Sequence, residues 1–192
     1  MCISSFAFAA SFSFDGNITY HNDIVKVNFT LDNDSTNVRV WTDSFQDGVN
    51  FDPITALWKK DGSDFGLISE NDDNEDIAPG QTDFDSGFSL STLGAGEYLL
   101  TVATYDNFAQ GELLSSGFLY DNQPPVLLAD WDQPANNTGM GSYYRVHLDG
   151  VDSATNPVPV PGTMTLFGIG ILGLAACRRR ESEYFFLLNQ TL

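Results

Sequence analysis

Residues 23–31 read Asp-Ile-Val-Lys-Val-Asn-Phe-Thr-Leu, and this stretch decides the fold. Successive side chains of an extended chain point to opposite faces. One face of the segment is therefore wholly apolar, and it consists of Val25, Val27, Phe29 and Leu31. The other face is mostly polar. A period of two in hydrophobicity is typical of a β-strand with one buried face.

Similar short runs recur along the chain and are separated by turn residues. We expect further strands at 37–42, 53–59, 65–70, 84–90, 97–105, 117–120 and 143–148. Turns are expected at Lys60-Asp61-Gly62, Ala78-Pro79-Gly80 and Gly94-Ala95-Gly96. No segment before Pro157 shows a helical period. Eight or nine short strands predict an all-β domain over residues 11–151, a single antiparallel β-sandwich of the jelly-roll kind.

The C-terminal part of the chain has a different character, because a linker over 152–162 with three prolines leads into an apolar segment. Residues 158–180 read VPVPGTMTLFGIGILGLAACRRR. The run from Met164 to Cys177 is shorter than the ~18–20 residues that cross a bilayer unaided, and counting from Val158 makes a marginal span. Its glycines suit a membrane helix, and the positive-inside rule keeps the arginines cytoplasmic. We predict a membrane helix over 163–180; the alternative is a buried core helix.

This order of prolines, hydrophobic segment and arginine cluster resembles the PEP-CTERM sorting signal of Gram-negative bacteria. The matching residues are Pro159, Pro161, Arg178, Arg179 and Arg180. Val160 replaces the usual glutamate, and an atypical tail over 181–192 follows the arginines. The resemblance implies processing by a sorting transpeptidase of the exosortase kind. It also implies export, a transient or permanent inner-membrane anchor, and a periplasmic or extracellular body associated with exopolysaccharide.

The N-terminus agrees with export. Residues 1–10, MCISSFAFAA, are apolar and contain the small-residue pattern Ala7-Phe8-Ala9, which is typical of a signal-peptide cleavage site. The segment lacks a basic beginning and is short for a complete signal. We interpret it as the remnant of a secretory signal peptide; the alternative is a hydrophobic N-terminal strand.

Composition limits what the body can do. Residues 11–156 hold 24 of the 26 acidic residues and five of the eight basic ones, a net charge of −19. Binding to phosphates needs a positive surface, so nucleic acid is excluded as a partner. The two cysteines, Cys2 and Cys177, lie outside the body, which excludes cysteine nucleophiles and thiolate metal sites from it. The aromatic content of 13% and the apolar content of 42% are ample for a core.

Two further resemblances concern the body. The segments 17–23, 37–44, 50–53 and 144–148 are similar to a family of exported bacterial proteins that carry PEP-CTERM signals and have no established activity. The segments 51–62, 67–73 and 96–102 more distantly resemble bacterial pre-peptidase C-terminal domains. Those domains are jelly-roll sandwiches appended to secreted enzymes, and some bind calcium or polymeric substrates.

The acidic segment 70–76, Glu-Asn-Asp-Asp-Asn-Glu-Asp, is a candidate site. A hairpin turn at 60–63 would pair Trp58 with Phe65, Ile54 with Ser69 and Asp52 with Asn71. Asp52 would then lie beside the acidic segment, and crowded carboxylates attract a cation such as calcium. The expected ligands are Asp52, Asp72, Asp73, Asp76 and Asp83. Ile77 stands where an EF-hand needs glycine, which leaves an irregular calcium site or a solvated acidic loop.

Catalytic motifs give little support for an enzyme. The chain has no G-x-S-x-G, no H-E-x-x-H and no glycine-rich phosphate loop. Trp131, between Asp130 and Asp132, is a candidate for stacking on sugars, although such a tryptophan also suits the plug of a sandwich end. We expect a non-enzymatic surface or matrix protein. The alternatives are a calcium-dependent glycan-binding or adhesin module and a glycoside hydrolase that uses two carboxylates.

Overall fold

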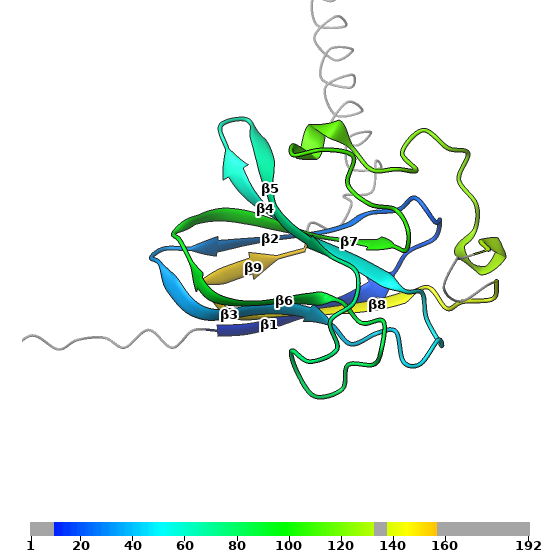
Figure 1. Ribbon diagram of the computed structural model, residues 1–192, viewed down its shortest axis with the longest axis horizontal. Coiled ribbons are helices and arrows are strands. Elements are labelled where there is room, and N and C mark those ends of the chain that lie inside the picture. The colour runs from blue at the N-terminus through cyan, green and yellow to red at the C-terminus, as the bar shows by residue number, and fades with distance from the viewer. Residues whose placement is uncertain (1–9, 133–137, 157–192) are drawn as a thin grey trace, which may run out of the picture. The chain divides into compact units, whose positions relative to one another are not determined.

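The computed structural model describes residues 10–132 and 138–156, and this part of the chain is built from strands (Figure 1). The strands are β1 (Ala10–Asn17), β2 (Val25–Leu31), β3 (Ser35–Thr42), β4 (Pro53–Asp61), β5 (Asp64–Asn71), β6 (Gly87–Leu93), β7 (Gly96–Thr104), β8 (Tyr143–Val151) and β9 (Ser153–Thr155). Two short 3-10 turns, η1 (Leu114–Ser116) and η2 (Leu128–Asp130), interrupt the long connection between β7 and β8. The predicted all-β class is confirmed.

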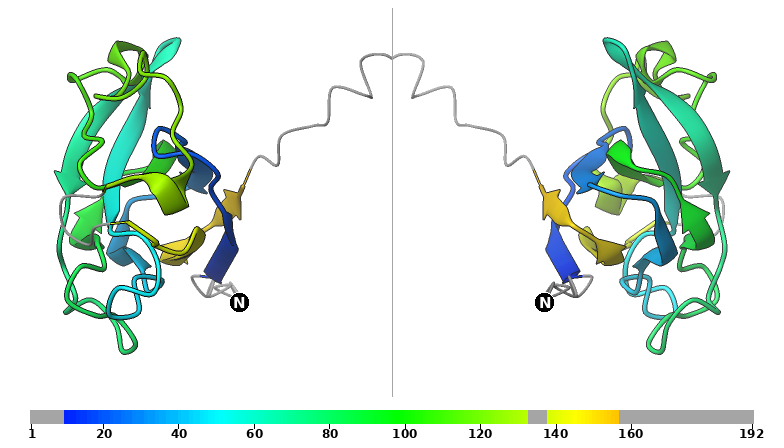
Figure 2. Two further views of the ribbon diagram at one scale, coloured as in Figure 1. Left: turned by 90° about the vertical axis from the view of Figure 1, so that its right-hand side faces the viewer. Right: turned by 90° about the vertical axis from the view of Figure 1, so that its left-hand side faces the viewer.

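The strands form two antiparallel sheets. One sheet has the order β1-β8-β3-β6 and the other the order β5-β4-β7-β2-β9. The pairing is nested: β1 pairs with β8, β2 with β7, β3 with β6, and β4 with β5. Figure 2 shows the β4–β5 hairpin on one side of the body and β1 on the opposite side. Each sheet therefore combines strands from both halves of the sequence.

The main core fills the space between the sheets. The apolar face of residues 25–31 contributes to it as expected, since Val27 and Phe29 are almost fully buried there. Facing strands add Val40, Leu100 and Leu148. A smaller cluster of Ala56, Trp58, Leu99 and Phe118 lies apart from the main core. Phe118 and the segment around it thus cover one patch of the β4–β7 pair.

The structure differs from the expected strands in three places. Residues 117–120 are not a strand, because Gly117 has φ +76° and Phe118 serves as an anchor that packs edge-on against Trp58. Strand β1 begins at Ala10, and its alternating Phe12 and Phe14 pack against the main core. Ser153–Thr155, expected within the linker, form β9 on the edge of β2.

The predicted register of the β4–β5 hairpin was wrong. Lys60 pairs with Phe65 and Trp58 with Leu67, because the turn contains only Gly62 and Ser63. The positive φ of Gly62, +58°, permits this tight connection. A register shift between Leu57 and Trp58 then makes Thr55, and not Asp52, the partner of Asn71.

Several predictions concern residues outside the described part of the chain. These are the signal-peptide remnant at 1–9, the membrane helix over 163–180, the sorting residues Pro159, Pro161 and Arg178–Arg180, and the tail over 181–192. Within residues 10–132 and 138–156, no helix is long and apolar enough to span a bilayer.

Candidate functional site

Three carboxylates meet at the open end of the β4–β5 hairpin. Asp52 directly precedes β4, and Asp72 and Asp73 directly follow β5. One carboxylate oxygen from each of the three residues lies within 4.8 Å of the others. The hairpin thus brings Asp52 beside the acidic segment despite the different register. Oxygen ligands at this spacing are of the kind that calcium takes.

Burial sets the electrostatics of the group. Asp52 is only 2% exposed, and loss of water raises its pKa to about 8, with the charges of Asp72, Asp73 and Asp85 adding to the effect. Burial also raises the pKa of Asp72 to about 6, again with neighbouring acids contributing. The pKa of Asp73 is raised by partial burial and by Glu75. Protons therefore compete with any cation for these oxygens at neutral pH.

Hydrogen bonds fix the loop that carries Asp72 and Asp73. The Gln81 side chain accepts from the backbone N–H groups of Ile77 and Ala78, both at 2.9 Å, and donates to the Asn74 carbonyl at 2.9 Å. The Asn71 amide donates to the Gly87 carbonyl at 2.8 Å. The acidic loop is therefore held in one shape by its own side chains, independently of an ion.

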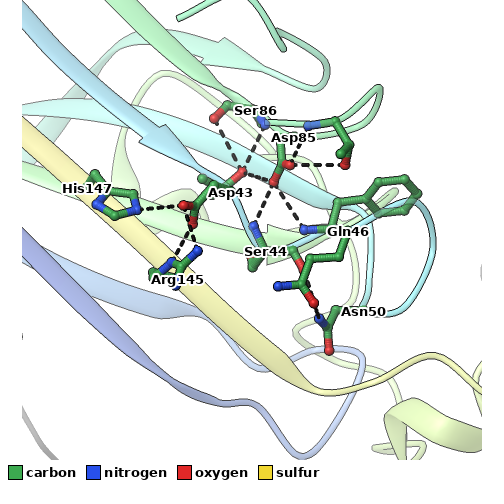
Figure 3. A network of polar contacts seen from close by, with 11 residues as sticks. Asp43, Ser44, Gln46, Asn50, Asp85, Ser86, Arg145 and His147 are labelled. Carbon is green, nitrogen blue, oxygen red and sulfur yellow. Dashed lines mark hydrogen bonds and ion pairs between the residues drawn. The ribbon is translucent and has the colours of Figure 1, made fainter. Parts of the chain in front are cut away.

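Asp85 organises the chain below this loop (Figure 3). Its side chain is fully buried and accepts from the N–H groups of Ser44 and Thr82, both at 2.9 Å, and of Phe45 at 3.1 Å. The Thr42 hydroxyl donates to it at 2.9 Å. Sequence reasoning placed residue 85 within a strand and missed this role, because local composition does not distinguish a satisfied buried carboxylate from a surface one.

A second polar network lies on the sheet that contains β3 and β8 (Figure 3). Arg145 donates to both carboxylate oxygens of Asp43, at 2.6 and 2.7 Å, and His147 Nε2 lies 3.0 Å from the same carboxylate. The His147 ring stacks on Trp41 with centroids 4.9 Å apart. His147 is thus tied into a structural ladder between two strands.

Asp76 and Asp83 do not join the three carboxylates. Both are exposed, and neither belongs to the group within 4.8 Å among the described residues. The reason is the fold of the loop between them, in which Ile77 is buried and held by Gln81. The spacing that resembles a calcium loop in the sequence does not make one ligand shell in space.

Trp131 lies in an aromatic cluster at one end of the body. Its ring stacks on His21 at 4.3 Å and meets Tyr120 at 5.2 Å, and the side chain packs against the main core. His21 is fully buried, and its Nδ1 accepts from the Val126 N–H at 3.1 Å. These contacts match the plug of a sandwich end that the sequence left open as an alternative.

Comparisons with known proteins bear mainly on the C-terminus. The PEP-CTERM protein-sorting motif matches residues 157–180. No curated protein matches the chain. Among solved structures, the crystal structure of Yersinia pseudotuberculosis-derived mitogen is similar, with 13% identity, a TM-score of 0.40, and coverage of 79% of this chain and 99% of that one. The sorting motif marks this chain as an exported, surface-directed protein of a Gram-negative bacterium, processed by an exosortase.

Proposed function

We propose that this protein is a non-enzymatic component of the cell surface or extracellular matrix, held by its C-terminal segment and associated with exopolysaccharide. The observation that carries the proposal is the sorting motif at 157–180, which follows a closed sandwich at once. The body's net charge of −19 keeps such a displayed domain soluble and repels anionic lipid.

The nested strand pairing supports a jelly-roll classification of the body. Eight strands pair as four successive hairpin partners, which is how a jelly roll wraps two Greek keys into two sheets. Such sandwiches serve as display and binding modules as well as enzyme scaffolds. The fold therefore fits a surface role without assigning a ligand.

A structural role also fits the polar side chains that sequence reasoning weighed for catalysis. Asp85 and Asp43 are saturated by hydrogen bonds from the chain, and His147 is clamped between Asp43 and Trp41. A general base needs access to a substrate proton and a pKa suited to it. These three groups are committed to holding strands and loops together.

The anchor is tested by cell fractionation of the full chain. Replacing Gly170 and Leu172 by arginine should release the protein from the membrane, because each mid-helix charge costs ~2.5–3.5 kcal/mol on insertion scales. Alanine at the same two positions is the matched control and should leave the protein bound. Wild-type protein that is already soluble and uncleaved would end the proposal.

A second candidate function is that of a calcium-dependent binding module. The grouping of Asp52, Asp72 and Asp73 within 4.8 Å favours it. Extracellular calcium modules bind with Kd ~10⁻⁴–10⁻³ M, so ~10 mM calcium should stabilise the body by roughly 1.4–2.7 kcal/mol. Melting with calcium and with magnesium at equal ionic strength separates binding from screening.

Two double variants sharpen this calcium test. Asp72→Asn with Asp73→Asn should abolish the calcium-specific shift in Tm, whereas Asp76→Asn with Asp83→Asn should keep it, because those two acids lie outside the group. Equal shifts from both metals in every variant would leave only a solvated acidic loop. A glycan array run with and without calcium then asks whether the bound ion recruits a sugar.

A further inference from the structure

Strand β9 is the shortest element of either sheet and the last one before the sorting motif. It covers Ser153–Thr155 and pairs only with Asn28, Phe29 and Thr30 of β2, at the edge of the five-stranded sheet (Figure 1). The sorting motif begins at residue 157, so that Asn156 alone separates it from the strand. The body is therefore fastened by an edge strand immediately beside the segment that the sorting enzyme must recognise.

The attachment of β9 is slight. Ala154 is the one side chain of the strand that packs against the main core, whereas β1 contributes Phe12 and Phe14. The remaining contacts are polar and lie at the surface: Ser153 Oγ is 2.7 Å from Thr30 Oγ1, and the Asn156 amide donates to the Tyr144 hydroxyl at 3.0 Å. A strand with so little buried apolar surface belongs to the low-stability end of a fold and opens without global unfolding.

Docking of β9 limits how much free chain precedes the motif. Four residues connect Thr155 to Pro159, a reach of at most about 14 Å when fully extended. If β9 detaches, the last fixed residue becomes Val151, and eight residues give a reach of about 28 Å. Enzymes that take peptides in extended form use the backbone groups of the bound segment, and in docked β9 those groups face β2.

We propose that β9 is a releasable strand that gates access of the exosortase to the motif, so that processing requires its detachment from β2. This inference rests on the sorting assignment and adds a control step to it. The rate of cleavage then follows the population of molecules in which β9 is open. The device needs no second ligand, because the strand and the motif lie on the same stretch of chain.

A disulfide between β9 and β2 tests the gate in the full-length chain. Thr30 and Ser153 are cross-strand partners whose hydroxyl oxygens are 2.7 Å apart, so Thr30→Cys with Ser153→Cys should form a bridge in an oxidising compartment. Conversion of the chain to its processed form is followed on gels, using membranes that contain the exosortase. The oxidised variant should be processed at least about tenfold more slowly than wild type, and reduction of the same sample should restore the rate.

Three controls separate the gate from other causes. Each single cysteine variant should be processed like wild type. Insertion of Gly-Ser-Gly-Ser after Asn156 should rescue the oxidised variant, because it lengthens the free chain without releasing β9. Ala154→Pro, which weakens the ladder directly, should be processed at least as fast as wild type.

The outcomes distinguish the gate from the sorting assignment. Oxidised, bridged protein that is processed at the wild-type rate would overturn the gate, as would slower processing of Ala154→Pro. Wild-type protein that is not processed at all would instead refute the sorting assignment, and the gate with it.

Discussion

Replacing Asp52 by asparagine should stabilise the body at alkaline pH and change it little in acid. The folded pKa of Asp52, about 8, lies above its value of 3.8 without burial. The folded state therefore holds an extra proton between these values, and stability is lost as the pH rises through this window. Asparagine has nearly the same shape and never ionises, so it removes this loss.

The size of the effect follows from the shift in pKa. One pKa unit corresponds to about 1.36 kcal/mol, so a rigid site would make the benefit of Asp52→Asn about 4 kcal/mol larger at about pH 9 than at about pH 5. Water reaching the more exposed Asp73 relaxes the site, and we expect roughly half of that difference. Asp72 titrates in both proteins, so most of its contribution cancels.

Urea denaturation of residues 10–156 at the two pH values, with a chelator present, measures this difference. Asp83→Asn, which removes an exposed carboxylate of the same region, is the control and should show a flat profile. Parallel pH profiles for wild type and Asp52→Asn would refute the argument from burial. Added calcium should reverse the order of the two proteins at alkaline pH if the carboxylates bind it, because only wild type keeps all three ligands.

Three more predictions follow from the fold. Asp85→Ala should cost about 3 kcal/mol or more in urea unfolding, because it leaves several buried donors unpaired, whereas Asp83→Ala should be nearly neutral. Gly87→Ala should lower Tm by many degrees, since the new Cβ would lie 2.3 Å from a backbone oxygen, and Gly66→Ala, whose nearest such atom is 3.9 Å away, should be far milder. Residues 10–156 alone should give a β-type far-UV spectrum and a single cooperative melt; a helical or random-coil spectrum would contradict this.

The two-sheet sandwich was predictable because its signal is local. Alternation in residues 25–31 survives any tertiary context, since one face must be buried wherever the strand lies. Strand β9 was not predictable, because Ser-Ala-Thr has no alternation to detect and pairs only after β2 offers an edge. Likewise Phe118 looked like strand and proved to be a loop anchor, since burial alone does not fix backbone geometry.

The candidate site was predictable in part for a similar reason. A hairpin of any register brings the residues flanking its two strands together, so Asp52 meets Asp72 and Asp73 even though the expected register was wrong. The positions of Asp76 and Asp83 depend on the path of an irregular loop, which is set by Gln81 and Ile77. Such a path arises from side-chain bonds across several residues and leaves no periodic trace in the sequence.

The nested pairing of the strands also dictates when the molecule can fold. Ala10 pairs with Val151, so the first strand has no partner until nearly the whole body has been delivered. Contacts of such long sequence separation make folding slow, on a scale of milliseconds to seconds for all-β domains. A chain of this topology remains extended while it is threaded through an export channel and closes only on the far side. During that interval its apolar faces are unprotected, and mutual repulsion among 24 acidic residues keeps the waiting chains apart.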